Sequence, residues 1–408
     1  MRGPRWLLGR ALDLRLWRPA HAAYVWRRAG RRGGAPLGPG DSRRRIAEAA
    51  SWLTRAQDAT GDGGVAGRYR LDSGWSSSYP ETTGYLIPTF LRLHAGGHSG
   101  FEERAERALD FLLRLQLPSG AFPGGEVAEN LSEPSVFNTA QILHGLLAWA
   151  AHTGDAATGE AAGRAGEWLV SVQDEDGAWR EHVYRGTPTT YVAHASCWLA
   201  EAGRQLDRPE FLAAAGRHLD WVLGHQDPAT GWFDLCGFSE ADHRARQSVT
   251  HTIAYTVWGV LFAAEVLHRD DGIAAARRAA EAIGRRLASD GRLAGVLDHE
   301  WRPRADWTCV TGNCQMALIW QRLARRAGAT GEAGEAGGGA TADYQSWARR
   351  ALELAAGSQS LTSAEDGIRG GLPGSDPVWG DYIYAAFPNW AAKFFLDALM
   401  NEEDAVSP

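Results

Sequence analysis

Apolar and polar positions along the chain repeat with the period of α-helices, and several of these helices end at the same short element. In WLVSVQDEDGAW (168–179), an apolar helical stripe stops at Gln173, a polar turn follows, and Gly177 precedes an aromatic residue. Related stretches are WLTRAQDATGDGGV (52–65), FLLRLQLPSGAF (111–122), WVLGHQDPATGWF (221–233), RLASDGRLAG (286–295) and GSQSLTSAEDGIRGG (357–371). Recurrence at a regular interval is the signature of a repeat architecture, so the pattern predicts six units.

The glycines of the turns measure the length of the repeat. We align them as Gly64, Gly120, Gly177, Gly231, Gly291 and Gly367. Successive intervals are 56, 57, 54, 60 and 76 residues. The last interval is lengthened by GATGEAGEAGGGATA (328–342), whose Gly/Ala-rich composition predicts a flexible surface insertion.

A second helix follows each turn after a connection of roughly 15–20 residues, which is longer than most connections and therefore a place to expect function. These second helices are more apolar on all sides than the first helices, which is typical of buried helices. They are expected at 80–94, 135–150, 188–203, 248–267, 308–324 and 387–399.

Six pairs of one amphipathic and one apolar helix predict an all-α fold, an (α/α)6 toroid with the apolar helices in an inner ring. An open solenoid is the alternative, but solenoids carry polar caps at both ends. Here the last apolar helix is followed only by a short acidic tail, 401–408. The sequence therefore predicts one toroid domain over 42–400, with its long loops on one face, preceded by an arm at 1–41.

Charge sets the arm apart from the body. The first 45 residues hold twelve arginines against Asp13 and Asp41, a net charge of +10, and −7 for the whole chain leaves −17 for the remainder. Three tryptophans interleave with these arginines, so residues 1–32 are expected either to contact an anionic membrane surface peripherally or to pack on the body. The acidic body argues against nucleic acid. The four scattered cysteines suit a reducing cytoplasm.

In such a toroid the first turns of the inner helices and the preceding loops point into one mouth. Helix N-termini expose N–H groups and a positive dipole end, which suit polar or anionic ligands. The expected lining residues are Glu81, Asn138, Tyr191, His251, Asn313 and Asn389, with Gln141, His194, Tyr255 and Lys393 one turn deeper. We assign Glu81, His251 and Tyr255 to acid/base catalysis, since His titrates near neutral pH and a carboxyl can be tuned there. A structural role for each, in capping or filling the core, is the alternative.

The loops contribute further candidates for substrate binding. These are Asp234, Arg369, Trp379 and Asp381. Loop aromatics suit a carbohydrate groove, because apolar sugar faces stack on aromatic rings, although such rings also plug the ends of a toroid. Cys309, Cys314 and His251 are residue types that bind zinc, but a CxxxxC spacing is a weak signal for a zinc site. The sequence thus predicts neither a metal nor a cofactor.

From about residue 45 onward the chain resembles a family of bacterial proteins found with polysaccharide-biosynthesis genes. The resemblance rests on SYPETTGYLIPTF, VFNTAQILHGLL, THTIAYTVWGVL, CVTGNCQMALIW and PVWGDYIYAAFPNWAAKFF. Members often carry the name delta-aminolevulinic acid dehydratase, but that enzyme is a TIM barrel, and nothing here alternates strand with helix. An acid is common in this family at the position of Asn138. If that acid is catalytic in relatives, Asn138 weakens the enzyme hypothesis for this chain.

More broadly, the chain resembles two groups of (α/α)6 toroids. One comprises the six-hairpin glycosidases, with unsaturated glucuronyl hydrolases, polysaccharide lyases and sugar epimerases. The other is the terpenoid cyclase and protein prenyltransferase fold, whose repeats carry a similar Gln–turn–Gly–aromatic element, although a DxDD motif is absent here. The resemblance implies a hydrolase, lyase or epimerase that acts on a uronate-containing or lipid-linked glycan. A terpenoid cyclase-like or prenyltransferase-like enzyme and a non-catalytic glycan-binding scaffold are the alternatives.

Overall fold

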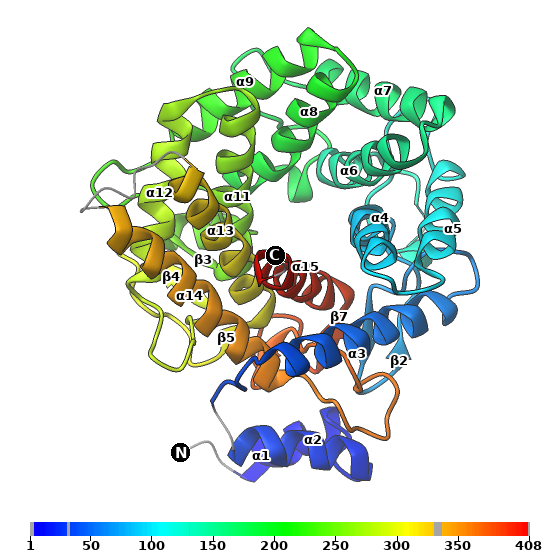
Figure 1. Cartoon of the computed structure of the whole chain (residues 1–408), viewed down its shortest axis with the longest axis vertical. Coiled ribbons are helices and arrows are strands. Elements are labelled where there is room, and N and C mark those ends of the chain that lie inside the picture. The colour runs from blue at the N-terminus through cyan, green and yellow to red at the C-terminus, as the bar shows by residue number, and fades with distance from the viewer. Residues whose placement is uncertain (1–3, 31–32, 130, 330–336, 407–408) are drawn as a thin grey trace.

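Six inner helices surround a common axis and six outer helices cover them, which confirms the predicted (α/α)6 toroid (Figure 1). The computed structural model describes residues 4–30, 33–129, 131–329 and 337–406. The inner helices are α4 (Pro80–Ala95), α6 (Val136–Thr153), α8 (Ala193–Gln205), α11 (Thr250–Val266), α13 (Val310–Ala329) and α15 (Asn389–Val406). The outer helices are α3 (Pro39–Asp58), α5 (Phe101–Leu113), α7 (Ala156–Ser171), α9 (Pro209–Leu223), α12 (Asp270–Gly284) and α14 (Gly337–Ser358).

The ring closes on itself. Each inner helix contacts the next, and α15 contacts both α4 and α3 of the first repeat. Residues 250–257, the first two turns of α11, are all buried, as expected for a helix with neighbours on every side. The apolar character of the second helices therefore reflects their place between the outer ring and the axis.

One hydrogen-bonded joint recurs around the ring. The Gln173 side-chain amide donates to the carbonyl of Gly177 (3.0 Å) in its own turn and to that of Ala214 (2.9 Å) in the next outer helix. The same pair of bonds links four other glutamines to a turn glycine and a neighbouring outer helix: Gln57 (Gly63, Arg104), Gln116 (Gly120, Ala161), Gln226 (Gly231, Ala275) and Gln359 (Gly370, Arg45). Because Arg45 lies on α3, the sixth joint ties the last repeat to the first.

The fifth repeat has no glutamine, and Asn313 of the inner helix takes its place. The Asn313 amide donates to the carbonyls of Gly291 (2.7 Å) and Ala351 (3.5 Å), which correspond to the two acceptors of the other joints. Asn313 is fully buried. It is therefore a structural residue rather than part of the mouth where the sequence analysis placed it.

The structure corrects two of the aligned turn glycines. The residues with positive φ at the joints are Gly63 and Gly370, rather than Gly64 and Gly367. At Gly177 (φ +88°) an added Cβ would lie 2.3 Å from the carbonyl oxygen of Arg217 on the next outer helix. The turn therefore needs glycine for both its backbone conformation and its close approach to the neighbouring repeat.

Short strands and single turns shape the loops that precede the inner helices. The strands form a sheet of β2 (Gly74–Trp75), β1 (Arg68–Arg70) and β7 (Ala386–Pro388), and the pairs β3 (Gln247–Val249)–β4 (Val296–Asp298) and β5 (Thr308–Cys309)–β6 (Ser375–Asp376). All these pairings are antiparallel, and β1 with β7 joins the first repeat to the last. The short helices are η1 (Val127–Glu129), η2 (Tyr184–Gly186), η3 (Thr190–Val192) and α10 (Glu240–Ala245). Strands of two or three residues leave no alternating pattern, so the sequence did not predict them.

The N-terminal arm forms α1 (Pro4–Asp13) and α2 (Pro19–Gly30), which lie against the sixth repeat (Figure 1). The buried Arg28 guanidinium binds Asp376 through two hydrogen bonds (3.1 and 2.5 Å) and donates to the carbonyl of Gly357 (2.7 Å). The Arg10 guanidinium donates to the carbonyl of Trp379 (3.1 Å). The arm is thus bonded to the loop that leads into α15.

Two segments differ from the sequence analysis or lie partly outside the described residues. Helix α15 continues to Val406, because Glu402 pairs with Arg349 (2.9 Å) and Asp404 with Arg92 (3.1 Å), so residues 401–406 are not a separate tail. Of the expected insertion at 328–342, the ends belong to α13 and α14, and residues 330–336 lie outside the described residues. Among the helices that the structure describes, none is long and apolar enough to cross a membrane.

The joint makes a prediction about stability. Gln173→Ala leaves two backbone carbonyls without their donor, so the free energy of unfolding should fall by roughly 1–3 kcal/mol. Glu175→Ala, in the exposed part of the same turn, is the matched control and should change it by less than about 0.5 kcal/mol. Urea denaturation of both variants checks this, and equal losses would show that the amide does not hold the joint.

Candidate active site

The loops and the first turns of the inner helices enclose a cavity of 970 Å³ at one end of the toroid. Six of the residues that the sequence analysis proposed line it: Glu81, Asn138, Tyr191, His251, Tyr255 and Asp381. They come from α4, α6, η3, α11 and the loop before α15. Tyr79, Phe137, Phe238, Tyr382 and Trp390 also line the cavity and were not proposed. We call this space the mouth cavity.

Glu81 is a buried carboxyl in the first turn of α4. Its carboxylate accepts a hydrogen bond from the Tyr79 hydroxyl (2.7 Å). Burial raises the pKa of Glu81 to about 7, and the Tyr79 hydrogen bond opposes that rise. A carboxyl group in this state holds its proton up to near neutral pH and is suited to act as a general acid.

His251 is a buried imidazole at the start of α11. Its Nδ1 lies 2.9 Å from the Gln315 side-chain oxygen, an acceptor, which places the ring proton on Nδ1 and leaves the lone pair on Nε2. Burial lowers the pKa of His251 to about 4, and the bond to Gln315 opposes that fall. Above that pH the ring is neutral and suited to accept a proton.

Aromatic rings surround His251. The Tyr255 ring centroid lies 4.3 Å from that of His251, and the Tyr382 centroid lies 5.3 Å from it. The Tyr382 hydroxyl accepts a hydrogen bond from the Trp390 indole (2.9 Å). Burial holds the pKa of Tyr255 well above its usual value of 10, so its hydroxyl stays protonated as a hydrogen-bond donor.

Asn138 lines the mouth cavity, but its amide already serves the fold. The side-chain nitrogen donates to the carbonyl of Pro123 (3.3 Å), and the side-chain oxygen accepts from the Ser135 hydroxyl (3.2 Å). A carboxylate at this position would have no proton to donate to Pro123. The asparagine therefore fastens the loop before α6 in a way that an ionised acid does not.

Several other residues proposed from the sequence lie away from the mouth cavity. Gln141 and His194 are buried deeper between α6 and α8, where the Gln141 amide donates to the His194 carbonyl (3.4 Å). The buried Asn389 amide donates to the carbonyl of Ala66 (3.0 Å) and to Thr82 (2.8 Å). These three residues hold helices and loops together.

Of the loop residues proposed from the sequence, some also lie away from the mouth cavity. Asp234 binds Arg246 (2.9 Å), and Arg369 binds Asp366 (3.1 Å) and faces the outer helix α3 near Glu48. Neither lines the mouth cavity, and neither does Trp379, which belongs to the loop wall beside the arm. Of the four loop candidates, only Asp381 reaches it.

Carboxylates outnumber arginines in the lining of the mouth cavity. Besides Glu81, the acidic residues are Glu126, Glu129, Glu133, Asp242 and Asp381, against Arg68 and Arg185. Arg68 is itself paired with Glu126. The entrance of the cavity is therefore net negative.

The cysteines show no sign of metal binding. Cys309 and Cys314 are buried, and burial raises the pKa of the Cys309 thiol to about 12. Within the described ranges, no three His, Cys, Asp or Glu side chains are grouped so that they could hold a metal ion.

Comparisons with known proteins support the fold. No family model matches the chain. Among solved structures, an unsaturated glucuronyl hydrolase specific for heparin has a TM-score of 0.69 and 14% identity, and covers 90% of this chain and 98% of its own. The unsaturated glucuronyl hydrolase of Bacillus sp. GL1, responsible for the degradation of glycosaminoglycan, has a TM-score of 0.68, 14% identity and coverage of 90% and 97%. Cellobiose 2-epimerase of Bacillus thermoamylovorans B4167 has a TM-score of 0.67, 12% identity and coverage of 89% and 98%.

A curated relative points to the second group of toroids. The terpene cyclase–glycosyl transferase fusion protein fsoA of Humicola fuscoatra is 29% identical over 177 residues, 39% of this chain. The match covers 12% of that protein, so the chain spans a small part of the relative's length. At these identities the likenesses define the chain as an (α/α)6 toroid.

The raised pKa of Glu81 predicts a pH-dependent stability. A carboxyl whose pKa is about 7 when folded and 4.5 when unfolded stabilises the fold fully below pH 4.5, and this contribution is lost as pH rises through 7. Relative to Glu81→Gln, the native protein should lose roughly 3 kcal/mol of unfolding free energy between pH 4 and 8. Chemical denaturation across this range tests it, and Glu175→Gln should behave as the native chain. Parallel pH curves for native and Glu81→Gln would contradict a buried, protonated Glu81.

Proposed function

We propose that this protein is an enzyme that acts on a carbohydrate by acid/base catalysis, with Glu81 as the acid and His251 as the base. One observation carries the proposal. The same cavity holds a carboxyl whose pKa is raised to about 7 and an imidazole whose pKa is lowered to about 4. Between these values the carboxyl keeps its proton and the imidazole is unprotonated, which is the pairing that proton transfer requires.

The surroundings of Glu81 favour proton transfer at a sugar carbon over hydrolysis. A glycosidase needs two cooperating carboxylates. The pKa of Glu81 is set by burial and by Tyr79, without a contribution from another carboxylate. In an epimerase or lyase, the neutral His251 removes a proton from the carbon beside a carbonyl while Glu81 protonates the carbonyl oxygen. In epimerisation the enediol then turns, the His251 imidazolium returns the proton to the other face of that carbon, and the Glu81 carboxylate takes back the enol proton. In a lyase, departure of the leaving group from the next carbon takes the place of this return.

The charge of the mouth cavity bears on the substrate. The acidic entrance favours an uncharged sugar over a uronate, because carboxylates repel a second anion. The rings of Phe137, Tyr255 and Tyr382 provide apolar surfaces for a sugar. We therefore favour an uncharged sugar at the mouth cavity over the uronate-containing glycan predicted from the sequence. The solved neighbours comprise unsaturated glucuronyl hydrolases as well as a cellobiose 2-epimerase, so both kinds of substrate are represented among them.

We further propose that the arm docks on an anionic membrane. Leu12, Trp17 and Trp26 are 56, 63 and 72% exposed, and we call them the arm face. Arginines interleave with the arm face, and the body of the chain carries the opposite charge, so an acidic lipid surface complements the arm alone. Residues 1–3 and 31–32 of the predicted membrane segment, and the side chain of Trp6, lie outside what the structure describes.

A terpenoid cyclase-like activity is the second candidate. It is favoured by the match to the terpene cyclase–glycosyl transferase fusion protein and by the aromatic lining of the mouth cavity. A buried, protonated carboxyl such as Glu81 is also suited to protonate an alkene. In that reaction the substrate is a polyprenyl chain and the final carbocation loses a proton to a base such as His251, so the class of substrate, rather than the need for His251, separates the two candidates experimentally.

Activity should follow the two pKa values. With neutral and uronate-containing oligosaccharides as substrates, turnover should fall below about pH 4, where His251 is protonated, and above about pH 7, where Glu81 is ionised. Glu81→Gln and His251→Ala should each lower kcat roughly 100-fold or more. Product analysis by chromatography and reducing-end assays measures this.

The activity assay has a control variant and three results that would contradict the proposal. Glu175→Gln changes an acid on the exposed outer turn and should leave turnover unchanged. Native turnover with either variant would overturn the assignment of roles. Conversion of a polyprenyl substrate that needs Glu81, without turnover of any glycan, would establish the second candidate, and glycan binding without turnover would indicate a scaffold.

Membrane docking has its own measurement. The chain should co-sediment with vesicles of phosphatidylcholine and phosphatidylserine, and less so as salt rises, because salt screens the attraction. Trp17→Ala with Trp26→Ala should reduce the bound fraction roughly tenfold or more, since each indole buries a large apolar area. Tyr184→Ala removes an exposed aromatic outside the arm and should have no effect. An unchanged bound fraction in the variant without Trp17 and Trp26 would refute this docking surface.

A further inference from the structure

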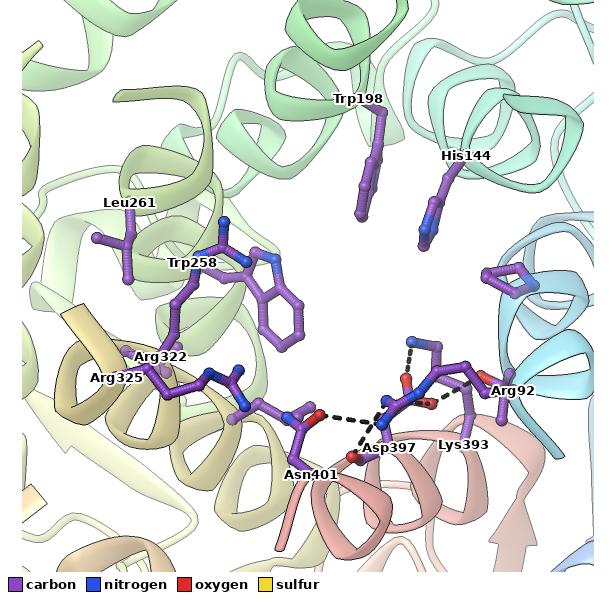
Figure 2. Close-up of a pocket in the computed structure, with 14 residues that line it drawn as sticks. Arg92, His144, Trp198, Trp258, Leu261, Arg322, Arg325, Lys393, Asp397 and Asn401 are labelled. Carbon is purple, nitrogen blue, oxygen red and sulfur yellow. Dashed lines mark hydrogen bonds and ion pairs between the residues drawn. The ribbon is translucent and has the colours of Figure 1, made fainter. Parts of the chain in front are cut away.

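We propose that the end of the toroid opposite the mouth cavity binds a phosphate group, as inorganic phosphate or as a small phosphate monoester. The site is a pocket of 210 Å³ on the axis of the ring, which we call the rear pocket (Figure 2). All six inner helices contribute to it, through residues that lie beyond the first turn of each helix. It is independent of the proposed activity of Glu81 and His251.

Cations dominate the rear pocket. Arg92, Arg322, Arg325 and Lys393 line it, against one carboxylate, Asp397. Asp397 is already engaged by Lys393 (2.5 Å) and by the Thr89 hydroxyl (3.0 Å). Figure 2 shows the arginines of α13 on one side of the opening and Arg92 on the other.

Arg325 is the cation that the fold leaves free. Arg92 binds Asn401 (3.1 Å) and pairs with Asp404 (3.1 Å), and Arg322 binds Glu265. By contrast, no described residue forms a hydrogen bond or an ion pair with the Arg325 guanidinium. Desolvation and the nearby positive charges of Arg322 and Arg92 lower the pKa of Arg325. An anion placed between these arginines would relieve that repulsion.

The pocket also holds polar atoms with nothing to bind. The indole nitrogens of Trp198 and Trp258 and the Nδ1 of His144 are buried without a hydrogen-bond partner among the described residues. These three atoms have no exposed surface, so a ligand in the rear pocket reaches them only after a side chain turns. Helix C-termini attract cations, which accounts for some of the arginines, but it does not account for the convergence of Arg92, Arg322 and Arg325 on one opening.

The donor set matches a tetrahedral oxyanion. Guanidinium N–H groups only donate, and the guanidinium of Arg325 has no partner among the described residues. Several converging donors with an excess of positive charge suit a doubly charged phosphate better than a neutral ligand. The open face of Trp258 leaves room for a small organic group on that phosphate (Figure 2).

The rear pocket is separated from the mouth cavity by a thin layer of aromatic rings. The Lys393 ammonium lies 4.5 Å from the Phe394 ring centroid and 5.6 Å from that of Tyr85, and Tyr85 lines the mouth cavity on its other side. His194 packs between Tyr255 (4.3 Å) and Trp258 (5.9 Å) in the same layer. The two cavities are therefore distinct sites on one axis.

Titration calorimetry with the full chain tests the proposal, using inorganic phosphate and glucose 1-phosphate as probes and sodium chloride at matched ionic strength. Saturable binding of one molecule per chain is expected for at least one probe. Arg325→Ala should weaken it at least tenfold, and Arg322→Ala, which removes a second guanidinium of the opening, should weaken it several-fold. A preference for glucose 1-phosphate would identify the organic ester as the ligand, and a preference for phosphate the free ion.

Arg326→Ala is the matched control, because it removes the same charge from the next residue of α13, outside the rear pocket. Its affinity should stay within twofold of the native value. Absence of saturable binding with both probes would overturn the proposal. An equal loss in Arg325→Ala and Arg326→Ala would also overturn it, because it would show attraction by surface charge alone. Loss in Arg325→Ala with unchanged thermal stability would support a direct contact.

Discussion

The toroid depends on a hydrogen bond that a side-chain amide makes twice. At each glutamine joint one NH₂ group satisfies a carbonyl of its own turn and a carbonyl of the next outer helix, as Gln173 does for Gly177 and Ala214. A carbonyl left unpaired at such a contact is costly, so each repeat is completed only by its neighbour. Asn313 performs the same task from the inner helix of the fifth repeat, which shows that the pair of bonds matters more than the residue that provides it.

Closure of this ring creates the chemistry of the mouth cavity. It brings the first turns of inner helices from distant repeats around one space and removes them from water. Burial then acts in opposite directions on two ordinary side chains, raising the pKa of Glu81 and lowering that of His251. The arm belongs to the same arrangement, because Arg28 and Arg10 hold the loop that carries Asp381 and Tyr382. Acidic groups surround the mouth and basic groups surround the rear pocket.

Part of the candidate site was predictable from residue type and position. Glu81 and His251 stand in the first turns of inner helices and Tyr255 one turn deeper, and that placement alone indicated the mouth cavity. Asn313 and Asn389 stand at equivalent positions, yet Asn313 serves a joint and Asn389 holds a loop to α4, and no sequence signal separates them from a ligand-binding asparagine. Tyr382 and Trp390 were not predicted, because aromatic residues are frequent throughout the loop before α15 and at the start of that helix. Only the folded structure shows that the Tyr382 ring packs against His251 and that Trp390 donates a hydrogen bond to Tyr382.

The sequence by itself determined the number of repeats and the pairing of an amphipathic with an apolar helix, because these follow from local periodicity and from glycines that only certain turns need. Tertiary structure decided the rest. It showed that Gly63 and Gly370 are the turn residues, that residues 401–406 continue α15, and that Arg369 and Asp234 lie outside the mouth cavity. It alone revealed the rear pocket, whose residues are scattered among six helices. Contacts between segments far apart in the chain leave no periodic trace, so the direction of a side chain and the pKa that burial gives it arise only when the ring is closed.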